Sequence, residues 1–393
     1  MRSRSASAAD LAEQGADHGV PAGLAASLAQ DGPIPLAATL ACAPGELLAL
    51  VGPSGSGKST ILRAIAGLYR PKDGRVTVDG EVWFDGAAGV WLAPHRRRVG
   101  LVFQSYALFP HLTALNNVMA ALGHLPRGDR RVRAGQLLEL VHLAGLEGRR
   151  PAELSGGQQQ RVAVARALGR EPKVLLLDEP FSAVDKATRQ KLYRELAELR
   201  RQLRMPVVLV THDLDEALML ADRLSLLHHG RTLQDGAPLQ VLQRPATVEA
   251  ARLVGQRNLF DATVLEHQAP PGFTILRWGG RVLEAERNPA HPVGAAVSWM
   301  IPSSHVVLHR RDRPSRGEHE NPVPGVLTEC LALGETTSCV LAVDGRAELP
   351  LAFSLPSHVA HRNRLAVGTP ATVSLLASGV HLMPRAKRDV SGA

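Results

Sequence analysis

The sequence predicts an α/β domain followed by a smaller all-β domain, and three stretches of the chain carry that prediction. An apolar run over residues 47–51 leads into the glycine-rich segment GPSGSGKST, after which apolar residues recur at helical spacing. A second apolar run at 173–180, KVLLLDEP, ends in two carboxylates. From about Asn258 the pattern changes to short β-like runs broken by Gly and Pro. A chain of 393 residues is long enough for two domains, each with its own core.

The segment at residues 52–60 matches the phosphate-binding P-loop pattern G-x-x-x-x-G-K-[ST]. Its glycines let the backbone curl around phosphates, and the helix expected from Ile61 onward directs its N-terminal amides at the same anion. Lys58 would reach the β- and γ-phosphates of ATP, and the Ser59 hydroxyl would coordinate Mg²⁺. A Gly/Ser turn between a strand and a helix is the alternative. The nucleotide-binding residues expected here are Gly52, Pro53, Ser54, Gly55, Ser56, Gly57, Lys58, Ser59 and Thr60.

Composition bounds the class of protein. The chain has 45% hydrophobic and 21% charged residues, as globular proteins do, and no uninterrupted apolar run long enough to span a bilayer. Its net charge is +8, but the arginines are scattered beside acidic residues, so nucleic acid is not an expected partner. Three cysteines form neither a disulfide framework nor a metal-ligand spacing, which fits a reducing compartment. Residues 1–22 lack a signal-peptide core and are expected to be disordered.

Local patterns predict the elements around the P-loop. Residues 24–50 alternate apolar stretches with turn signals, as antiparallel strands do. Asp79 and Gly80 separate two β-like runs and predict a two-residue hairpin. Residues 99–103 predict a further strand, after which the spacing becomes helical over 115–122 and 132–143.

The segment LSGGQ at residues 154–158 opens another run with helical spacing. Ser155 is placed as an N-cap, and Gln158 three residues later completes a capping box. Gly156 and Gly157 leave backbone amides open at this helix start, which suits an anion. A capped helix without a ligand is the alternative, and the P-loop in the same chain favours a second anion site.

Successive side chains of a strand point to opposite faces, so the two carboxylates that end the 173–180 run have different expected roles. Asp178 would face Mg²⁺, whereas Glu179 would polarise a water that attacks the γ-phosphate. The apolar run at 205–210 delivers His212 to the same edge of the sheet, within reach of the γ-phosphate. Paired surface acids and a structural histidine are the alternatives.

In order and spacing, these motifs resemble those of ABC-transporter ATPases. The resemblance rests on GPSGSGKST, LSGGQ, LLLDEP, Gln104 after a strand, residues 182–185 and His212, and covers about residues 24–245. It implies a head-to-tail homodimer in which the P-loop of one subunit and LSGGQ of the other enclose each ATP. It also implies that Gln104 joins the Mg²⁺ ligands Ser59 and Asp178, and that Glu179 and His212 are catalytic. Outside the P-loop, the implied nucleotide-binding set is Gln104, Ser155, Gly156, Gly157, Gln158 and Asp185.

The resemblance further implies membrane partners. Residues 104–118 are similar to the surface on which importer ATPases receive a permease helix, with Tyr106, Leu108 and Phe109 as contacts. The chain would then work peripherally at the cytoplasmic face of the inner membrane, with integral-membrane permease subunits and, through them, a periplasmic or extracellular binding protein. One departure from the family is that no aromatic residue precedes Tyr69 to stack on adenine.

The C-terminal runs resemble the OB-like or TOBE-type barrel of importer ATPases. The segments ATVLEH and IPSSHVVLH carry this resemblance. Together with WLAPHRRRVGLVFQ at residues 91–104 of the first domain, they make the chain most similar to molybdate importer ATPases. We therefore expect an ATP-binding domain at 23–245, with a helical subdomain at about 104–165, and a regulatory or dimerisation barrel at 258–386. Within this barrel, residues 318–321 (EHEN) hold two carboxylates where oxyanion-binding relatives have a Ser/Arg/Asn-type segment, so weak or no oxyanion binding is expected there.

The predicted function is ATP hydrolysis that powers a binding-protein-dependent importer of molybdate or a related oxyanion. Sulfate, polyamine and iron importers share nearly all these motifs and stay open as alternatives. A soluble ABC ATPase that acts on nucleic acid or ribosomes is an alternative of another class. Such proteins normally carry two P-loops or a long coiled-coil insertion, and this sequence has one P-loop and no sustained heptads.

Overall fold

The computed structural model describes residues 22–182, 184, 186–270, 272–309 and 319–385. The chain divides into two compact units, Met1–Pro238 and Leu239–Ala393. The tail expected at 1–22 therefore lies outside the described residues, apart from its last residue, and so does Asp185. No helix in the described ranges is long and apolar enough to cross a bilayer.

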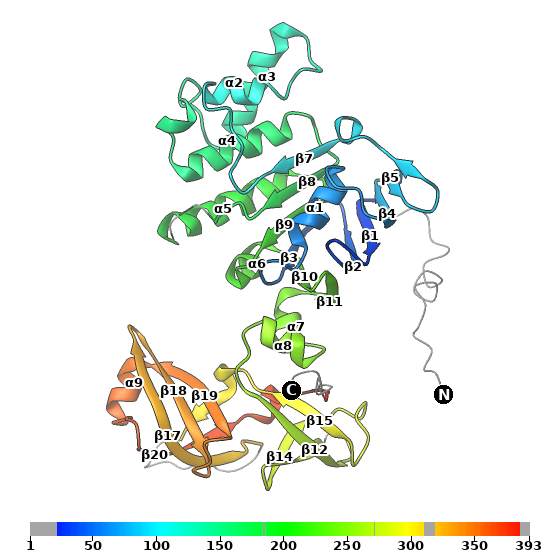
Figure 1. Ribbon diagram of the computed structural model, residues 1–393. Coiled ribbons are helices and arrows are strands. Elements are labelled where there is room, and N and C mark those ends of the chain that lie inside the picture. Colours follow the sequence, from blue (N-terminus) through cyan, green and yellow to red (C-terminus); the bar gives the residue numbers. More distant parts are fainter. Residues whose placement is uncertain (1–21, 183, 185, 271, 310–318, 386–393) are drawn as a thin grey trace. The chain divides into compact units, whose positions relative to one another are not determined.

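The first unit is built on one sheet, which has 11 strands in the described part of the chain and runs β6-β5-β4-β1-β2-β11-β10-β3-β9-β8-β7 (Figure 1). Strands β10, β3, β9, β8 and β7 are parallel to one another, whereas β2, β1, β4, β5 and β6 pair antiparallel. The strands are β1 Leu24–Gln30, β2 Leu36–Cys42, β3 Leu47–Val51, β4 Asp73–Val78, β5 Glu81–Asp85, β6 Val90–Trp91, β7 Val99–Val102, β8 Val174–Asp178, β9 Val207–Thr211, β10 Arg223–His228 and β11 Arg231–Gly236.

The helices of this unit include the ones that the sequence predicts after the P-loop, over 115–122 and 132–143, and after LSGGQ. Helices α2, α3 and α4 pack on one another beside β7 (Figure 1). The apolar spacing predicts these helices because it places their buried residues on one face. The helices are α1 Lys58–Ala66, α2 Ala114–Met119, α3 Arg127–Leu140, α4 Gly156–Leu168, α5 Lys186–Gln202 and α6 Leu214–Leu220.

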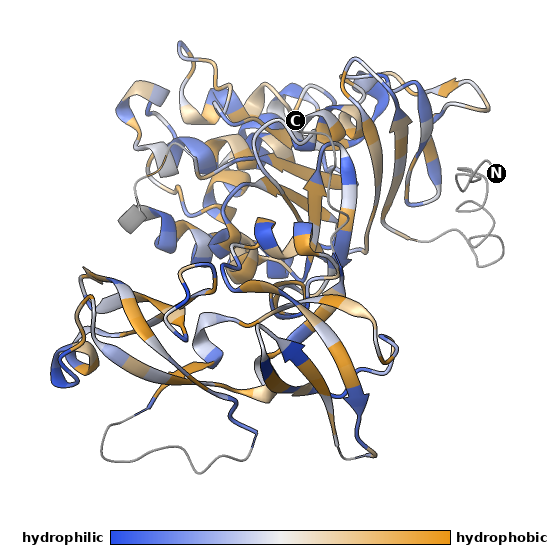
Figure 2. Ribbon diagram, turned by 60° about the horizontal axis from the view of Figure 1, so that its bottom comes forward, coloured by the Kyte–Doolittle hydropathy of each residue, from blue (hydrophilic) through white to orange (hydrophobic). Residues whose placement is uncertain are grey.

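The parallel strands are apolar throughout because both faces of the sheet are covered. In β8, Leu175 and Leu177 pack in one cluster with helices α2 to α5, whereas Val174 and Leu176 pack in another with α1 and the antiparallel strands. Figure 2 shows the central strands coloured as hydrophobic. A rigid central sheet follows, which holds its loops in fixed positions.

The predicted hairpin at residues 79–80 is present. Val78 and Glu81 are paired, and both turn residues have positive φ, 46° at Asp79 and 80° at Gly80. Such φ values match the twist of a two-residue hairpin. The antiparallel pair expected before the P-loop is present as β1 and β2. Strands β10 and β11 were not predicted from the sequence.

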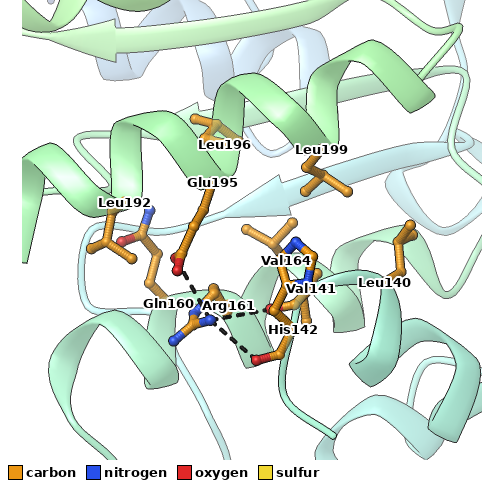
Figure 3. A pocket seen from close by; sticks show the side chains of 10 residues that line it. All are labelled: Leu140, Val141, His142, Gln160, Arg161, Val164, Leu192, Glu195, Leu196 and Leu199. Atoms are coloured by element: carbon orange, nitrogen blue, oxygen red, sulfur yellow. Dashed lines mark hydrogen bonds and ion pairs between the residues drawn. The ribbon is translucent and has the colours of Figure 1, made fainter.

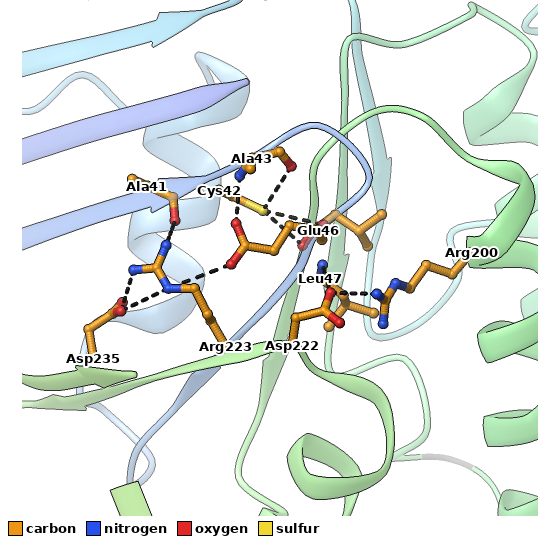
Figure 4. Close-up of polar contacts among 10 residues, drawn as sticks. Ala41, Cys42, Ala43, Glu46, Leu47, Arg200, Asp222, Arg223 and Asp235 are labelled. Carbon is orange, nitrogen blue, oxygen red and sulfur yellow. Dashed lines mark hydrogen bonds and ion pairs between the residues drawn. The ribbon is translucent and has the colours of Figure 1, made fainter. Parts of the chain in front are cut away.

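A cluster of charged residues ties the amino-terminal edge of the sheet together (Figure 4). Arg223 at the start of β10 pairs with Asp235 on β11 and with Glu46, whose Oε1 lies 3.5 Å away. Asp222 accepts a hydrogen bond from the amide of Leu47 at 2.8 Å and pairs with Arg200 of α5. These contacts hold β3 in register from the edge opposite the P-loop.

The second unit contains two antiparallel five-stranded sheets in its described residues, β14-β13-β12-β15-β21 and β16-β20-β17-β18-β19. One hydrophobic cluster takes residues from both, such as Leu276 and Trp299 of the first sheet and Leu341 and Phe353 of the second. The predicted all-β C-terminal domain is confirmed. Its elements are α7 Pro238–Gln243, α8 Val248–Leu253, β12 Leu259–His267, β13 Phe273–Trp278, β14 Arg281–Glu286, β15 Ala296–Met300, β16 Val306–Leu308, β17 Pro322–Leu333, β18 Thr336–Val343, β19 Pro350–Pro356, α9 Ser357–Arg362, β20 Pro370–Leu375 and β21 His381–Pro384.

Candidate functional site

The sheet topology brings the predicted site residues to one edge. Strands β3, β9, β8 and β7 are neighbours and parallel, with Val51 paired to Thr211 and Asp178 to Val210. The loops that follow their carboxyl ends therefore meet at the same edge, where α/β sheets bind ligands. These loops contain the P-loop, Glu179 and His212, and Gln104 follows the end of β7.

The P-loop requires its glycines for steric and conformational reasons. A Cβ on Gly52 would lie 2.1 Å from the carbonyl oxygen of Leu227, so no larger residue fits. Gly55 and Gly57 have φ of 80° and 95°, in the left-handed region that favours glycine. The turn after β10 thus lies against the P-loop, and the amide of Gly230 donates to the Ser56 carbonyl at 3.0 Å. No motif in the sequence indicated this contact.

The P-loop is chemically suited to phosphates. Helix α1 begins at Lys58 with Gly57 as its N-cap and no side-chain cap, so the amides of its first turn have no intrahelical acceptor. The hydroxyl of Ser56 is buried and, within the described residues, has no hydrogen-bond partner. The Lys58 ammonium donates to the carbonyls of Gly52 at 2.8 Å and Pro53 at 2.9 Å. Burial lowers the pKa of Lys58, although the charges of Glu179 and Asp178 raise it. The residues of the P-loop therefore fit the anionic phosphate chain of a nucleotide.

Oxygen atoms suited to Mg²⁺ adjoin the P-loop. The Ser59 hydroxyl donates to Oδ1 of Asp178 at 2.8 Å, although the two residues are 119 positions apart in sequence. Burial raises the pKa of Asp178, and its hydrogen bond to Ser59 lowers it. A hydroxyl and a carboxylate are hard oxygen ligands, which fit Mg²⁺. Gln104 is exposed, and no contact among the described residues joins its side chain to this pair.

Glu179 and His212 meet at the same edge. Oε2 of Glu179 lies 3.3 Å from Nδ1 of His212. The Glu179 amide donates to the Val210 carbonyl at 3.0 Å, which extends the β8–β9 pairing and fixes the backbone of this residue. Its φ is 44°, an uncommon value for a residue other than glycine. The structure thus brings together a carboxylate and an imidazole to which the sequence analysis assigned separate catalytic roles.

A buried network supports the end of β9. Glu216 of α6 is 3% exposed and accepts hydrogen bonds from Thr211 at 2.6 Å and from Tyr193 of α5 at 3.0 Å. Burial raises the pKa of Glu216, and the two hydroxyls lower it. This network was not predicted from the sequence, because nothing in the local pattern shows that residues 193 and 216 meet.

The capping box of the LSGGQ segment is present at the start of α4. The Gln158 amide donates to the Ser155 hydroxyl at 3.3 Å, and the Ser155 amide donates to the Gln158 side chain at 2.8 Å. Gly157 packs on α5, since a Cβ there would lie 3.0 Å from Leu192. Among the described contacts of a single chain, none joins Ser155, Gly156, Gly157 or Gln158 to the P-loop.

The expected permease surface is only partly exposed. Phe109 is 44% exposed, with the guanidinium of Arg166 5.5 Å from its ring centre. Tyr106 is 4% exposed and donates to the carbonyl of Pro180 at 3.2 Å, so its placement on the surface was wrong. Leu108 packs against the same core as Tyr106. The tyrosine is drawn inward because its hydroxyl finds a partner in the loop after β8.

A small cavity of about 30 Å³ lies between α3, α4 and α5 (Figure 3). The Arg161 guanidinium crosses it, 3.6 Å from the carboxylate of Glu195 and hydrogen bonded to the carbonyl of His142 at 3.2 Å. This volume suits one or two water molecules and is too small for a nucleotide. This cavity is therefore separate from the residues gathered at the carboxyl edge of the sheet.

The EHEN segment has other partners in the second unit. Glu318 lies outside the described residues. Nδ1 of His319 lies 2.8 Å from Glu284, and its ring stacks on Phe273 with centres 4.2 Å apart. The Asn321 side chain donates to the carbonyls of Glu284 and Leu375. These contacts use the polar groups of the segment, in keeping with the expectation of weak or no oxyanion binding there, which stays a prediction.

Comparison with known proteins identifies the family. Residues 37–182 match the family model described as ABC transporter. The chain is 41% identical over 317 residues to the spermidine/putrescine import ATP-binding protein PotA of Acidothermus cellulolyticus, covering 80% of each chain. It is 48% identical over 232 residues to the sulfate/thiosulfate import ATP-binding protein CysA of Caulobacter vibrioides, covering 57% of this chain and 66% of that protein. The solved structure of cbiO1 from Clostridium perfringens, part of the ABC transporter complex cbiONQ, matches with a TM-score of 0.51 and 28% identity, covering 56% of this chain and 91% of that one.

The family match agrees with the site geometry. Residues 37–182 include the P-loop, Gln104, LSGGQ and both carboxylates after β8. The similarity to the PotA protein is longer than the first unit, so it reaches into the all-β unit as well. A phosphate-binding loop, an acid pair and this similarity together show that the chain belongs to the ATP-binding subunits of ABC importers and is an ATP-hydrolysing enzyme.

Proposed function

We propose that this subunit powers the import of a polyamine, with sulfate as the second candidate. The similarity to the spermidine/putrescine relative carries the first choice, because it extends over 317 residues and includes part of the C-terminal unit. The sulfate relative is more similar, at 48%, but over 232 residues. Neither relative supports the molybdate expectation, which rested on two short C-terminal segments and on residues 91–104. Their names agree with two of the alternatives that the sequence left open.

The proposed nucleotide site combines cationic, amide and oxygen groups at the carboxyl edge of the sheet. Lys58 and the amides of the P-loop would hold the phosphates of ATP. Ser59, Asp178 and Gln104 would hold Mg²⁺, which neutralises phosphate charge when bound. Glu179 would accept the proton of the attacking water, and His212 would orient that carboxylate. The observation that carries this assignment is the 3.3 Å approach of Glu179 and His212 beside the Ser59–Asp178 bond.

We propose that the nucleotide site is completed by a second copy of the chain. Within one chain, none of the described contacts joins the amino end of α4 to the P-loop, yet its glycines leave amides open to an anion. In a head-to-tail dimer, residues 155–158 of the partner would close over the γ-phosphate. Asp185, outside the described residues, is proposed to contribute from the loop after Glu179.

The proposed partners are integral-membrane permease subunits and, through them, a binding protein on the outer side. This chain would then lie peripherally at the cytoplasmic face of the inner membrane. The exposed ring of Phe109 supports a docking surface near residues 109–112, since a large apolar side chain beside a cationic one is typical of interface centres.

Uptake measurements test this function. A bacterial strain that lacks the chain should lose import of radiolabelled spermidine and recover it with the wild type but not with Glu179→Gln. Sulfate uptake in the same strains distinguishes the second candidate, and molybdate uptake checks the sequence-based expectation. Normal import of all three compounds in the deleted strain would refute the proposal.

A further inference from the structure

The all-β unit contains a cavity of about 270 Å³ that the nucleotide chemistry does not use. It is lined by the segment 255–258, by Ser303, by Leu333 of β17, and by residues of strands β18 and β19. All of these residues belong to the second unit. The cavity is distinct from the described part of the EHEN segment, because residues 319–321 do not line it.

A buried asparagine holds one wall of the cavity in place. Asn258 is 2% exposed, and its Nδ2 donates to the carbonyls of Ile301 at 3.1 Å and Ala352 at 2.8 Å. Its Oδ1 accepts the amide of Ala352 at 2.7 Å. Two of these hydrogen bonds fix the segment that carries Arg257 against β19, and the third fixes it to Ile301 after β15. A wall fixed in this way is pre-formed, which reduces the ordering cost of binding.

Strands β18 and β19 supply the opposite wall. Ser338 and Ser354 are directly paired across the two strands. Their neighbours Cys339 and Phe353 are buried in the core, so the serines lie on the outer face of the sheet. Short hydroxyl side chains here leave the space that longer residues would fill.

The polar groups of the cavity suit an anion. Arg257 contributes a guanidinium that, in the described part of the chain, has no ion-pair partner, and Ser303, Ser338 and Ser354 contribute three hydroxyl donors. Among the described residues that line the cavity, none carries a carboxylate. Guanidinium and hydroxyl donors are the groups that recognise carboxylate, phosphate and sulfate oxygens.

We propose that this cavity binds an oxyanion group, namely a carboxylate, phosphate or sulfate. The site takes that group on a small organic molecule, because about 270 Å³ exceeds the space of an inorganic oxyanion and approaches the lower range of metabolite pockets, roughly 300 Å³. Leu333 and Ala352 provide apolar surface for the remainder of such a molecule. The all-β unit is then a sensor of an organic anion.

Calorimetry on the full chain tests the proposal. Saturating Mg·ADP keeps the P-loop filled, and the probes are inorganic phosphate, sulfate, benzoate and phenyl phosphate. The organic anions should bind more tightly than the inorganic ones. Arg257→Gln should weaken binding of phenyl phosphate at least tenfold, because the cationic partner is lost. Ser338→Val should weaken it as well, through a bulkier side chain that lacks the hydroxyl.

The matched control is Arg277→Gln, an exposed arginine on β13, which should bind like the wild type. Thermal unfolding of each variant checks that it is folded. Absence of binding by all four anions would overturn the proposal, and so would equal affinity of the wild type and Arg257→Gln. Tighter binding of inorganic phosphate or sulfate than of the organic probes would overturn the assignment to an organic ligand.

Discussion

At the scale of single residues, the contacts of Glu179 and Asp178 decide how each carboxylate is positioned. The backbone amide of Glu179 donates a hydrogen bond to the Val210 carbonyl of β9, and the imidazole of His212 lies beside its carboxylate. Asp178 is paired with a hydroxyl, and burial raises its pKa. The two adjacent carboxylates thus have different surroundings, which supports the different roles predicted for them.

Glu179→Gln should lower the rate of ATP hydrolysis about 10²- to 10⁴-fold and leave ATP binding intact, because the amide fills the same space but cannot accept a proton. Phosphate release measures the rate. With ATP, the variant should elute as a dimer in size-exclusion chromatography. Glu139→Gln, at an exposed position of α3, is the control and should hydrolyse ATP normally. Wild-type turnover in Glu179→Gln would remove Glu179 from its proposed role.

Glu216 should make stability depend on pH. Burial raises its pKa in the folded state, so the folded chain binds this proton more tightly than the unfolded chain does. This contribution therefore lowers stability as pH rises from the unfolded value of about 4.5 through the folded pKa. Glu216→Gln imitates the neutral form of this side chain. Urea unfolding should therefore show that the variant exceeds the wild type in free energy of unfolding by more at pH near 7.5 than at pH near 5. An equal difference at both pH values would contradict the prediction.

At the scale of elements, one buried arginine joins three segments. Arg97 is 1% exposed and donates to the carbonyls of Ala64 at 2.8 Å and Ile65 at 2.6 Å, at the end of α1, and to Trp83 of β5 at 3.0 Å. Burial lowers its pKa to about 10, so the side chain remains charged at neutral pH. A cation at a helix C-terminus is favourable. The contact ties the helix after the P-loop to the antiparallel strands.

Arg97→Gln should destabilise the first unit by about 3 kcal/mol, because several buried carbonyls lose a charged donor. Chemical denaturation followed by fluorescence measures the change. The neighbouring exposed Arg96→Gln is the control and should change stability by less than about 0.5 kcal/mol. A similar loss in both variants would mean that the buried contacts of Arg97 contribute little.

At the scale of the whole molecule, function requires surfaces that a single chain leaves open. The amino end of α4 and the ring of Phe109 are two such surfaces, proposed to meet a second copy and a permease. Leu108 is partly buried and packs against the core, so a charge there would disturb this packing. Phe109 is the better position for a test, since it is 44% exposed.

Phe109→Asp should preserve the basal ATPase activity of the isolated subunit and reduce capture of the cognate permease by at least tenfold, because an apolar contact is replaced by a hydrated charge. A pull-down from detergent extracts measures capture. Val132→Asp, at an exposed position of α3, is the control and should retain the permease. Undiminished capture by Phe109→Asp would show that this ring is not part of the docking surface.

Much of the fold and of the nucleotide site follows from the sequence alone. The P-loop, the capping box and the hairpin at 79–80 depend on residues close together in the chain, whose backbone preferences act locally. Uninterrupted apolar runs identified the central strands, because both faces of the sheet are covered. The family motifs indicated the enzyme class, because each motif is a short segment whose chemistry depends on neighbouring residues in the sequence.

Only the tertiary structure decided which distant residues meet. Sheet order places Asp178 against Ser59, 119 positions away, and packing draws Tyr106 inward. No local pattern predicted the burial of Arg97 or the cavity lined by Arg257, Ser338 and Ser354. Arginine and serine are usually exposed, so the sequence alone predicts them to lie on the surface. The local pattern therefore determined the elements and the P-loop, whereas strand order and packing determined the contacts, since these depend on segments that are far apart in sequence.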